Sequence, residues 1–328
     1  MKSFASLAVV IPLLASTSVS AHGFLNSITI AGKAYKGNTP AQGTSPSVIR
    51  QVSSPNPNYG ADNPALTCGP DAKAASLVAD ANPGDQLTFK WTGEDGSNWP
   101  HDTGPMQTYM ASCGSTTCDK FDSSQAKWFK ISEDGRRADG LWQQKTLFDG
   151  GVANSTIPST LAPGNYLLRH EIIALHLASE GPGKAEFYPA CAQLRVGGSQ
   201  SGAPASGDLV SIPGAYNDND PGLFDKDAYD AKVAYDFPGP AISTLGGTLP
   251  ASGSSSGSGN SGNSGNSGNG STTPSTTSGS APQATTSSKA GKQCKLKKRA
   301  VAADAFAVVR PRHISRVMRG LGIGGSKH

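Results

Sequence analysis

Short apolar runs separated by turn-forming residues recur from His22 to about Leu249, and they restrict the possible fold more than any other feature of the sequence. Runs such as Gln86–Trp91 and Asn165–His170 are bounded by Gly, Pro, Asn or Asp. The segment Tyr166–His176 alternates with a period of two, so successive side chains face opposite sides of an extended strand. The other runs of this kind include Phe24–Ile30, Met106–Met110 and Ala192–Val196. Because amphipathic helical patterns are scarce, the sequence predicts an all-β domain, a β-sandwich with long loops.

Residues 1–21 have the composition of a secretory signal peptide. Lys2 precedes the apolar run Leu7–Leu14, and small residues lead up to Ala21. The run is too short to span a bilayer, so we expect a secreted, extracellular protein without a membrane anchor. Cleavage after Ala21 makes His22 the first residue of the mature chain. The amine and the ring Nδ1 of a terminal histidine can chelate one metal ion together, and copper(II) favours such nitrogen ligands.

The cysteines fit an oxidising compartment, where paired cysteines form disulfides. Four of them lie in the expected domain, which predicts two disulfide bonds, and the fifth lies beyond it. The four are Cys68, Cys113, Cys118 and Cys191, and the fifth is Cys294. Four cysteines allow three pairings, and the pattern alone does not choose among them.

The segments that follow the domain (22–249) differ from it in composition. Residues 250–288 are rich in Ser, Gly, Asn and Thr, which predicts a flexible, O-glycosylated linker. Residues 289–328 carry a net charge of +10, whereas residues 22–288 carry −7, so we exclude nucleic acid as a partner of the domain. We expect residues 289–328 to be a disordered tail that is not a cellulose-binding module. The alternative is a surface-adhesion or processing segment, cut after its Lys-Lys-Arg run. Candidate N-glycosylation sites are Asn154 in the domain and Asn269 in the linker.

Two stretches of the domain contain residue types suited to metal chemistry. His101 lies among Pro and Gly residues, which predicts a stiff, exposed loop that leads into a strand. Together with a terminal His22, it can complete a T-shaped site of one amine and two imidazoles. Tyr188 is a candidate axial phenol, and Glu186 can reach the same site. The alternative for Tyr188 is an ordinary aromatic residue packed beside Cys191.

These motifs in combination resemble those of the fungal cellulose-active lytic polysaccharide monooxygenases, auxiliary activity family 9. The resemblance rests on the histidine at the cleavage site, Trp-x-His-x-x-Gly-Pro, and Tyr-Leu-Leu-Arg-His-Glu-Ile-Ile-Ala-Leu-His. It also rests on Glu-Phe-Tyr-Pro-Ala-Cys-Ala-Gln-Leu and Tyr-Asp-Phe-Pro-Gly-Pro, and it extends from His22 to about Ile242. It implies a sandwich of the immunoglobulin or fibronectin III kind.

The resemblance also implies a site. One copper ion per chain would be held by the amine and Nδ1 of His22 and by Nε2 of His101, with the Tyr188 phenol in an axial position. His176 would stand beside the site as a hydrogen-bond donor. Glu186 occupies a position where many members have Gln; because a carboxylate donates only when protonated, we expect an altered rate and pH profile. The implied disulfides are Cys68–Cys191 and Cys113–Cys118.

The activity implied by the resemblance is oxidative cleavage of β-1,4-glucan, crystalline cellulose first, at C1 or C4. The oxidant would be O2 or H2O2, and the electrons would come from a small reductant or from cellobiose dehydrogenase. Such an enzyme acts on a solid surface, so it needs a flat face with exposed rings rather than a deep pocket. Tyr229 and Tyr235 are candidates for this face, and Tyr59 is a weaker one. We expect a monomer.

Three other functions would require different sequence features. A glycoside hydrolase needs two facing carboxylates, and no motif singles out such a pair. A zinc peptidase needs His-Glu-x-x-His on a helix, whereas His170-Glu171 is followed by its next histidine at His176, in a strand pattern. A non-catalytic secreted carbohydrate-binding protein is the main alternative, and it predicts cellulose binding without any copper-dependent product.

Overall fold

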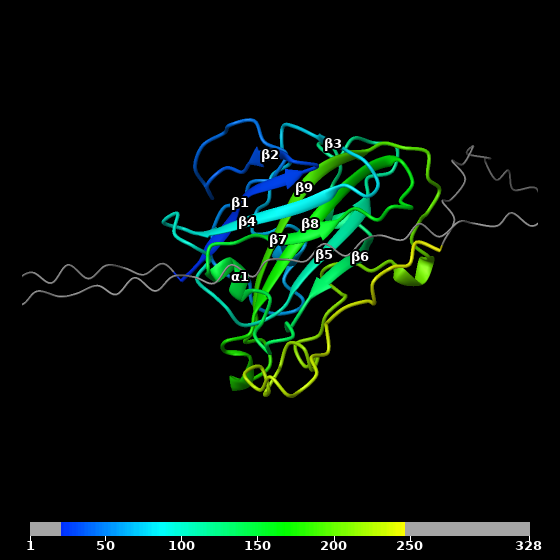
Figure 1. The fold of residues 1–328 in the computed structure, drawn as a ribbon. Helices are drawn as coiled ribbons and strands as arrows, with labels where there is room; N and C mark the ends of the chain where they lie inside the picture. Colours follow the sequence, from blue (N-terminus) through cyan, green and yellow to red (C-terminus); the bar gives the residue numbers. More distant parts are fainter. Residues whose placement is uncertain (1–20, 247–328) are drawn as a thin grey trace, which may run out of the picture. The chain divides into compact units, whose positions relative to one another are not determined.

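The structure, a computed structural model, describes residues 21–246 (Figure 1). The predicted linker and tail lie outside the described residues, together with Asn269, Cys294 and all of the signal peptide except Ala21. Among the described residues, no helix is long and apolar enough to cross a membrane.

Between residues 21 and 246, nine strands form two sheets, with strand orders β2-β1-β4-β7 and β3-β9-β8-β5-β6 (Figure 1). The strands are β1 (Gly23–Ile30), β2 (Lys33–Lys36), β3 (Ala79–Ala81), β4 (Gln86–Gly93), β5 (Met106–Ser112), β6 (Trp128–Asp134), β7 (Ala153–Thr156), β8 (Gly164–Ala174) and β9 (Glu186–Val196). The helical segments are α1 (Lys145–Phe148) and the 3-10 turns η1 (Pro64–Leu66), η2 (Ser123–Gln125), η3 (Ala178–Glu180) and η4 (Ser206–Asp208). All strand pairs except β3–β9 are antiparallel.

The main core lies between the two sheets. Phe89 and Trp91 of β4 and Ile28 of β1 pack in one cluster with Leu168 and Ile172 of β8. Residues that share a strand are separated by an even number of positions, two on β4 and four on β8, as expected for side chains on a single sheet face. The predicted β-sandwich is therefore confirmed.

The outer face of the five-stranded sheet is also covered. Leu167 and Ile173 of β8 pack in a second cluster with Leu66 of η1 and with Tyr216, which belongs to the long strand-free segment 209–246. Strand β8 is thus buried on both faces, and even its charged side chains are shielded from water.

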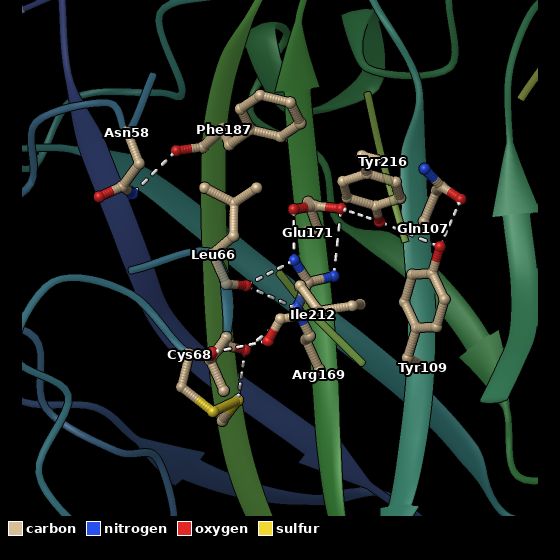
Figure 2. Close-up of polar contacts among 12 residues, drawn as sticks. Asn58, Leu66, Cys68, Gln107, Tyr109, Arg169, Glu171, Phe187, Ile212 and Tyr216 are labelled. Atoms are coloured by element: carbon tan, nitrogen blue, oxygen red, sulfur yellow. Dashed lines mark hydrogen bonds and ion pairs between the residues drawn. A yellow bond between two sulfur atoms is a disulfide. The ribbon is translucent and has the colours of Figure 1, made fainter. Parts of the chain in front are cut away.

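A buried ion pair anchors the covering segments (Figure 2). The Arg169 guanidinium pairs with the Glu171 carboxylate, and the side chains of both are fully buried. Arg169 also donates to the carbonyl oxygen of Leu66 at 2.7 Å, and the Tyr216 hydroxyl donates to Glu171 at 2.7 Å. Because an unpaired charge inside a protein is costly, these partners fix η1 and the long segment onto β8.

Residues 21–246 contain two disulfides, with the pairing implied by the family resemblance. Cys68–Cys191 joins the residues after η1 to β9 across 123 positions of the sequence. Cys113–Cys118 closes a turn after β5 across 5 positions. The longer bridge removes more conformational freedom from the unfolded chain, and it ties the η1 region to β9.

Candidate functional site

One end of the sandwich brings together residues that are far apart in the sequence. Strands β8 and β9 are antiparallel with Ala174 opposite Glu186, so the end of β8 lies beside the start of β9. His176 is the second residue after the end of β8, and Tyr188 is the third residue of β9. His101 lies in the loop that leads into β5, which is the other neighbour of β8.

Two glycines allow the chain to approach this end closely. Gly104 has a φ of +125°, and a Cβ there would lie 2.0 Å from the carbonyl oxygen of Ile173 on β8. A Cβ on Gly23 would lie 2.2 Å from the carbonyl oxygen of Thr92. Any larger residue would displace the His101 loop or the first strand, because neither backbone contact has room for a side chain.

The polar atoms of His101, His176 and Glu186 form a compact cluster. One ligand atom from each side chain lies within 4.8 Å of the other two, an arrangement that could hold a metal ion. Nε2 of His101 lies 3.5 Å from one Glu186 oxygen, and Nε2 of His176 lies 3.7 Å from the other. The two imidazole rings stack with centroids 4.5 Å apart. The cluster contains imidazole nitrogens and carboxylate oxygens, and all four cysteines of the described segment are in disulfides.

The junction between Ala21 and His22 lies at this cluster. Burial lowers the pKa of His101, and the neighbouring Glu186 carboxylate and a hydrogen bond to the backbone of Ala21 act in the opposite direction. His22 itself is partly buried, and its carbonyl oxygen accepts a hydrogen bond from the Glu94 amide at 2.9 Å. The predicted N-terminus of the mature chain is therefore beside His101.

The Tyr188 hydroxyl also contacts this cluster. Its hydroxyl lies 3.2 Å from Nε2 of His101 and donates to Glu186 at 2.8 Å. Burial and then the negative charge of Glu186 raise the pKa of Tyr188 far above its usual value, so the phenol is protonated at neutral pH. Trp99, fully buried, packs edge-on against both Tyr188 and His101. Trp99 belongs to the Trp-x-His motif, but the motif alone does not indicate this packing role.

Glu186 has a second phenol partner, Tyr59, which donates to its other oxygen at 2.7 Å. Tyr59 lies in the loop before η1, 127 positions away in the sequence. The sequence indicates Tyr59 only as a weaker candidate for a ring on the substrate face. No local pattern could have indicated its bond to Glu186, because the contact depends on the fold.

The two other candidate rings differ in their environments. Tyr229 is 67% exposed, and its hydroxyl donates to the carbonyl oxygen of His176 at 3.2 Å, so it borders the cluster. Tyr235 packs edge-on against Trp142 and Phe237, and its hydroxyl donates a hydrogen bond to the carbonyl oxygen of Gly222 at 2.7 Å. These neighbours cover part of the ring, and the place of Tyr235 on a substrate face stays a prediction.

The remaining histidine of the domain, His170, belongs to the core. It stacks on Phe89, accepts a hydrogen bond from Nε1 of Trp91 at 3.2 Å, and is almost completely buried. It lies on strand β8 with Glu171, so the helical zinc-peptidase motif is absent at these residues.

His170 makes folding stability depend on pH. Burial, and then the Arg169 charge, lower the pKa of His170 to about 3, so the folded state keeps the imidazole neutral. Below the unfolded pKa of about 6.5 the unfolded chain binds a proton that the folded chain does not. We expect this residue to reduce stability by about 1.4 kcal/mol per pH unit as the pH falls from 6.5 towards 3. Urea unfolding at several pH values should show a shallower dependence for His170→Phe; equal slopes would contradict the assignment.

Comparisons with known proteins agree with this geometry. The sequence model of Auxiliary Activity family 9 (formerly GH61) matches residues 22–235. The chain is 49% identical over 323 residues to AA9 family lytic polysaccharide monooxygenase D of Gloeophyllum trabeum, covering 94% of this chain and 93% of that relative.

Two solved structures have the same fold. A cellulose-active polysaccharide monooxygenase from M. thermophila is 36% identical, with a TM-score of 0.59 over 67% of this chain and 98% of that one. The extended catalytic domain of H. jecorina LPMO9A is 31% identical, with a TM-score of 0.62 over 71% of this chain and 96% of that one. The chain therefore belongs to Auxiliary Activity family 9, the family of its lytic polysaccharide monooxygenase relatives.

Proposed function

We propose that the mature chain is a secreted, copper-dependent monooxygenase that cleaves β-1,4-glucan, with cellulose as its first substrate. The observation that carries the proposal is the position of the Ala21–His22 junction against His101, in a cluster with His176 and Glu186. One family relative of known structure is described as cellulose-active, which supports the choice of substrate.

The donor set fits copper. After removal of the signal peptide, His22 offers its amine and Nδ1, His101 offers Nε2, and Tyr188 offers a phenol at the buried side. Nitrogen and oxygen donors without a thiolate suit copper(II) and do not suit a blue-copper electron-transfer site. When bound, copper supplies the one-electron chemistry with O2 or H2O2 that oxidation of an unactivated C–H bond requires.

The overall reaction inserts one oxygen atom at C1 or C4. With H2O2, a C–H bond becomes C–OH and the second oxygen leaves as water. With O2, the same product requires two electrons and two protons, supplied by a small reductant or by cellobiose dehydrogenase. The hydroxylated carbon then eliminates the neighbouring glycosidic oxygen, which breaks the chain.

The protein side chains around the ligands hold protons and orient the site. Glu186 accepts from the Tyr188 hydroxyl, so the phenol keeps its proton and its orientation. His176 stands beside Glu186 and His101 with its Nε2 directed into the cluster, where it can hydrogen-bond to the oxidant. Trp99 holds the Tyr188 and His101 rings in place by packing.

The substrate face would lie over this end of the sandwich. Tyr229 is an exposed ring whose hydroxyl donates a hydrogen bond to the His176 carbonyl oxygen, and it is our candidate for stacking on a glucose unit.

On the edge strand β7, Asn154 is exposed and is a candidate for N-glycosylation. We further propose that the protein is an extracellular monomer.

The test is mass spectrometry of the products released from cellulose by the copper-loaded mature protein with ascorbate. We expect oligosaccharides that carry aldonic acid or 4-ketoaldose ends and that disappear when a chelator is added. Cellulose binding without oxidised products would instead support a non-catalytic carbohydrate-binding protein. Release of unoxidised sugars alone, unaffected by reductant or chelator, would support a hydrolase.

A further inference from the structure

The Glu186 carboxylate is shared between two pairs of side chains. One oxygen lies near both the Tyr188 hydroxyl, at 2.8 Å, and Nε2 of His101, at 3.5 Å. The other lies near both the Tyr59 hydroxyl, at 2.7 Å, and Nε2 of His176, at 3.7 Å. Each oxygen thus has one phenol donor and faces one imidazole. The Glu186 side chain is only 6% exposed, so these four groups form most of its polar surroundings.

Tyr59 is held at this position by the strand that carries Glu186. The Asn58 amide and the Phe187 amide each donate to the other residue's carbonyl oxygen at 2.9 Å. The Asn58 side chain adds a hydrogen bond to the Phe187 carbonyl oxygen at 3.0 Å (Figure 2). Phe187 lies between Glu186 and Tyr188, so this double bridge fixes Tyr59 relative to both. The Tyr59 carbonyl oxygen also accepts from the Asn63 side chain at 3.1 Å.

A carboxylate suits a position between two phenol hydroxyls, because each of its two oxygens can accept a hydrogen bond. A buried carboxylate is costly unless its oxygens accept hydrogen bonds, and here each oxygen accepts from one phenol. A glutamine at this position would offer one acceptor oxygen and one NH2 group, so only one phenol could donate to it. The Tyr59 hydroxyl is therefore the group that makes the second Glu186 oxygen compatible with burial.

We propose that Tyr59 is a positioning residue of the metal centre, which holds the Glu186 carboxylate in one orientation between His101 and His176. This inference rests on the proposed function. Without the Tyr59 hydroxyl, the freed Glu186 oxygen would turn towards His176 or towards a metal ion bound by His101. The ligand environment of the ion would then change although every ligand is still present.

The test uses Tyr59→Phe, which removes the hydroxyl and keeps the ring. The mature full-length protein is loaded with one equivalent of Cu(II), and its electron paramagnetic resonance spectrum, copper affinity and rate of oxidised-product release are measured. We expect an altered spectrum, copper affinity within about tenfold of wild type, and a product rate lowered about tenfold, since a hydrogen bond to a charged group is lost. Tyr35→Phe, on strand β2, is the matched control and should change none of these quantities.

A double-substitution cycle separates positioning from other effects. In a Glu186→Ala background, Tyr59→Phe should have no further effect on the spectrum or the rate. An unchanged spectrum and rate in the single variant would overturn the inference, as would an equal effect of Tyr59→Phe with and without Glu186. A wild-type protein that binds no copper would instead overturn the proposed function, and this inference with it.

Discussion

Replacing His101 with alanine should abolish tight copper binding and oxidative activity together. In our proposal His101 supplies one of three nitrogen ligands, and no other imidazole of the described residues can replace it without moving. Loss of groups that only support a ligand typically lowers metal affinity 10- to 100-fold, so loss of the ligand itself should lower it by more than about 100-fold. Isothermal titration with Cu(II), followed by product analysis on cellulose, measures both quantities.

His176→Gln is the informative comparison for His101→Ala. His176 lies in the same cluster, and its ring stacks on that of His101, but we assign it no bond to the metal ion. We expect it to retain copper affinity within about tenfold while its product rate falls, because it acts as a supporting hydrogen-bond partner. A His101→Ala protein that retained both affinity and activity would remove His101 from the site.

Glu171→Gln should be among the most destabilising single substitutions in the domain. Its partner Arg169 is fully buried and stays charged, so removal of the Glu171 charge leaves a buried cation without its counter-ion (Figure 2). Breaking a buried pair in this way typically costs about 3–5 kcal/mol, a large part of the stability of an ordinary domain. The variant also weakens the hydrogen bond that the Tyr216 hydroxyl donates to residue 171.

The matched control for Glu171→Gln is Asp80→Asn. Asp80 pairs with Arg195 across β3 and β9, but both side chains are more than half exposed. Water screens such a pair, so its loss should cost less than about 1 kcal/mol. Urea denaturation of both variants gives the comparison. Similar losses for Glu171→Gln and Asp80→Asn would mean that the buried network does not anchor the covering segments.

The strand pattern predicted the sandwich well where apolar and polar residues alternate. The segment Tyr166–His176 corresponds to β8, which runs from Gly164 to Ala174. For β9, however, the sequence indicated only Ala192–Val196, whereas the strand already begins at Glu186. Pro189 obscures this part of the pattern, since proline lacks an amide donor. It is tolerated because β3 pairs only with Leu194–Val196, so no strand needs that donor.

The candidate site could be predicted only in part. The motifs around His101, His176 and Tyr188 are local, so the sequence and the family resemblance indicate them. The contact between Tyr59 and Glu186 and the packing of Tyr235 against Trp142 arise from residues far apart in the chain, and no spacing rule encodes them.

The central claim is that signal-peptide cleavage creates the metal site by freeing the amine of His22. Isothermal titration of Cu(II) into two forms of the protein tests it most directly: one begins at His22, and the other retains Ala21 with its amine acetylated, because a free Ala-His terminus could itself chelate Cu(II). In the second form the His22 nitrogen is a peptide amide, which cannot chelate together with Nδ1 as a free amine does. We predict one tight site in the first form and an affinity lower by orders of magnitude in the second. Equal affinities in the two forms would contradict the claim.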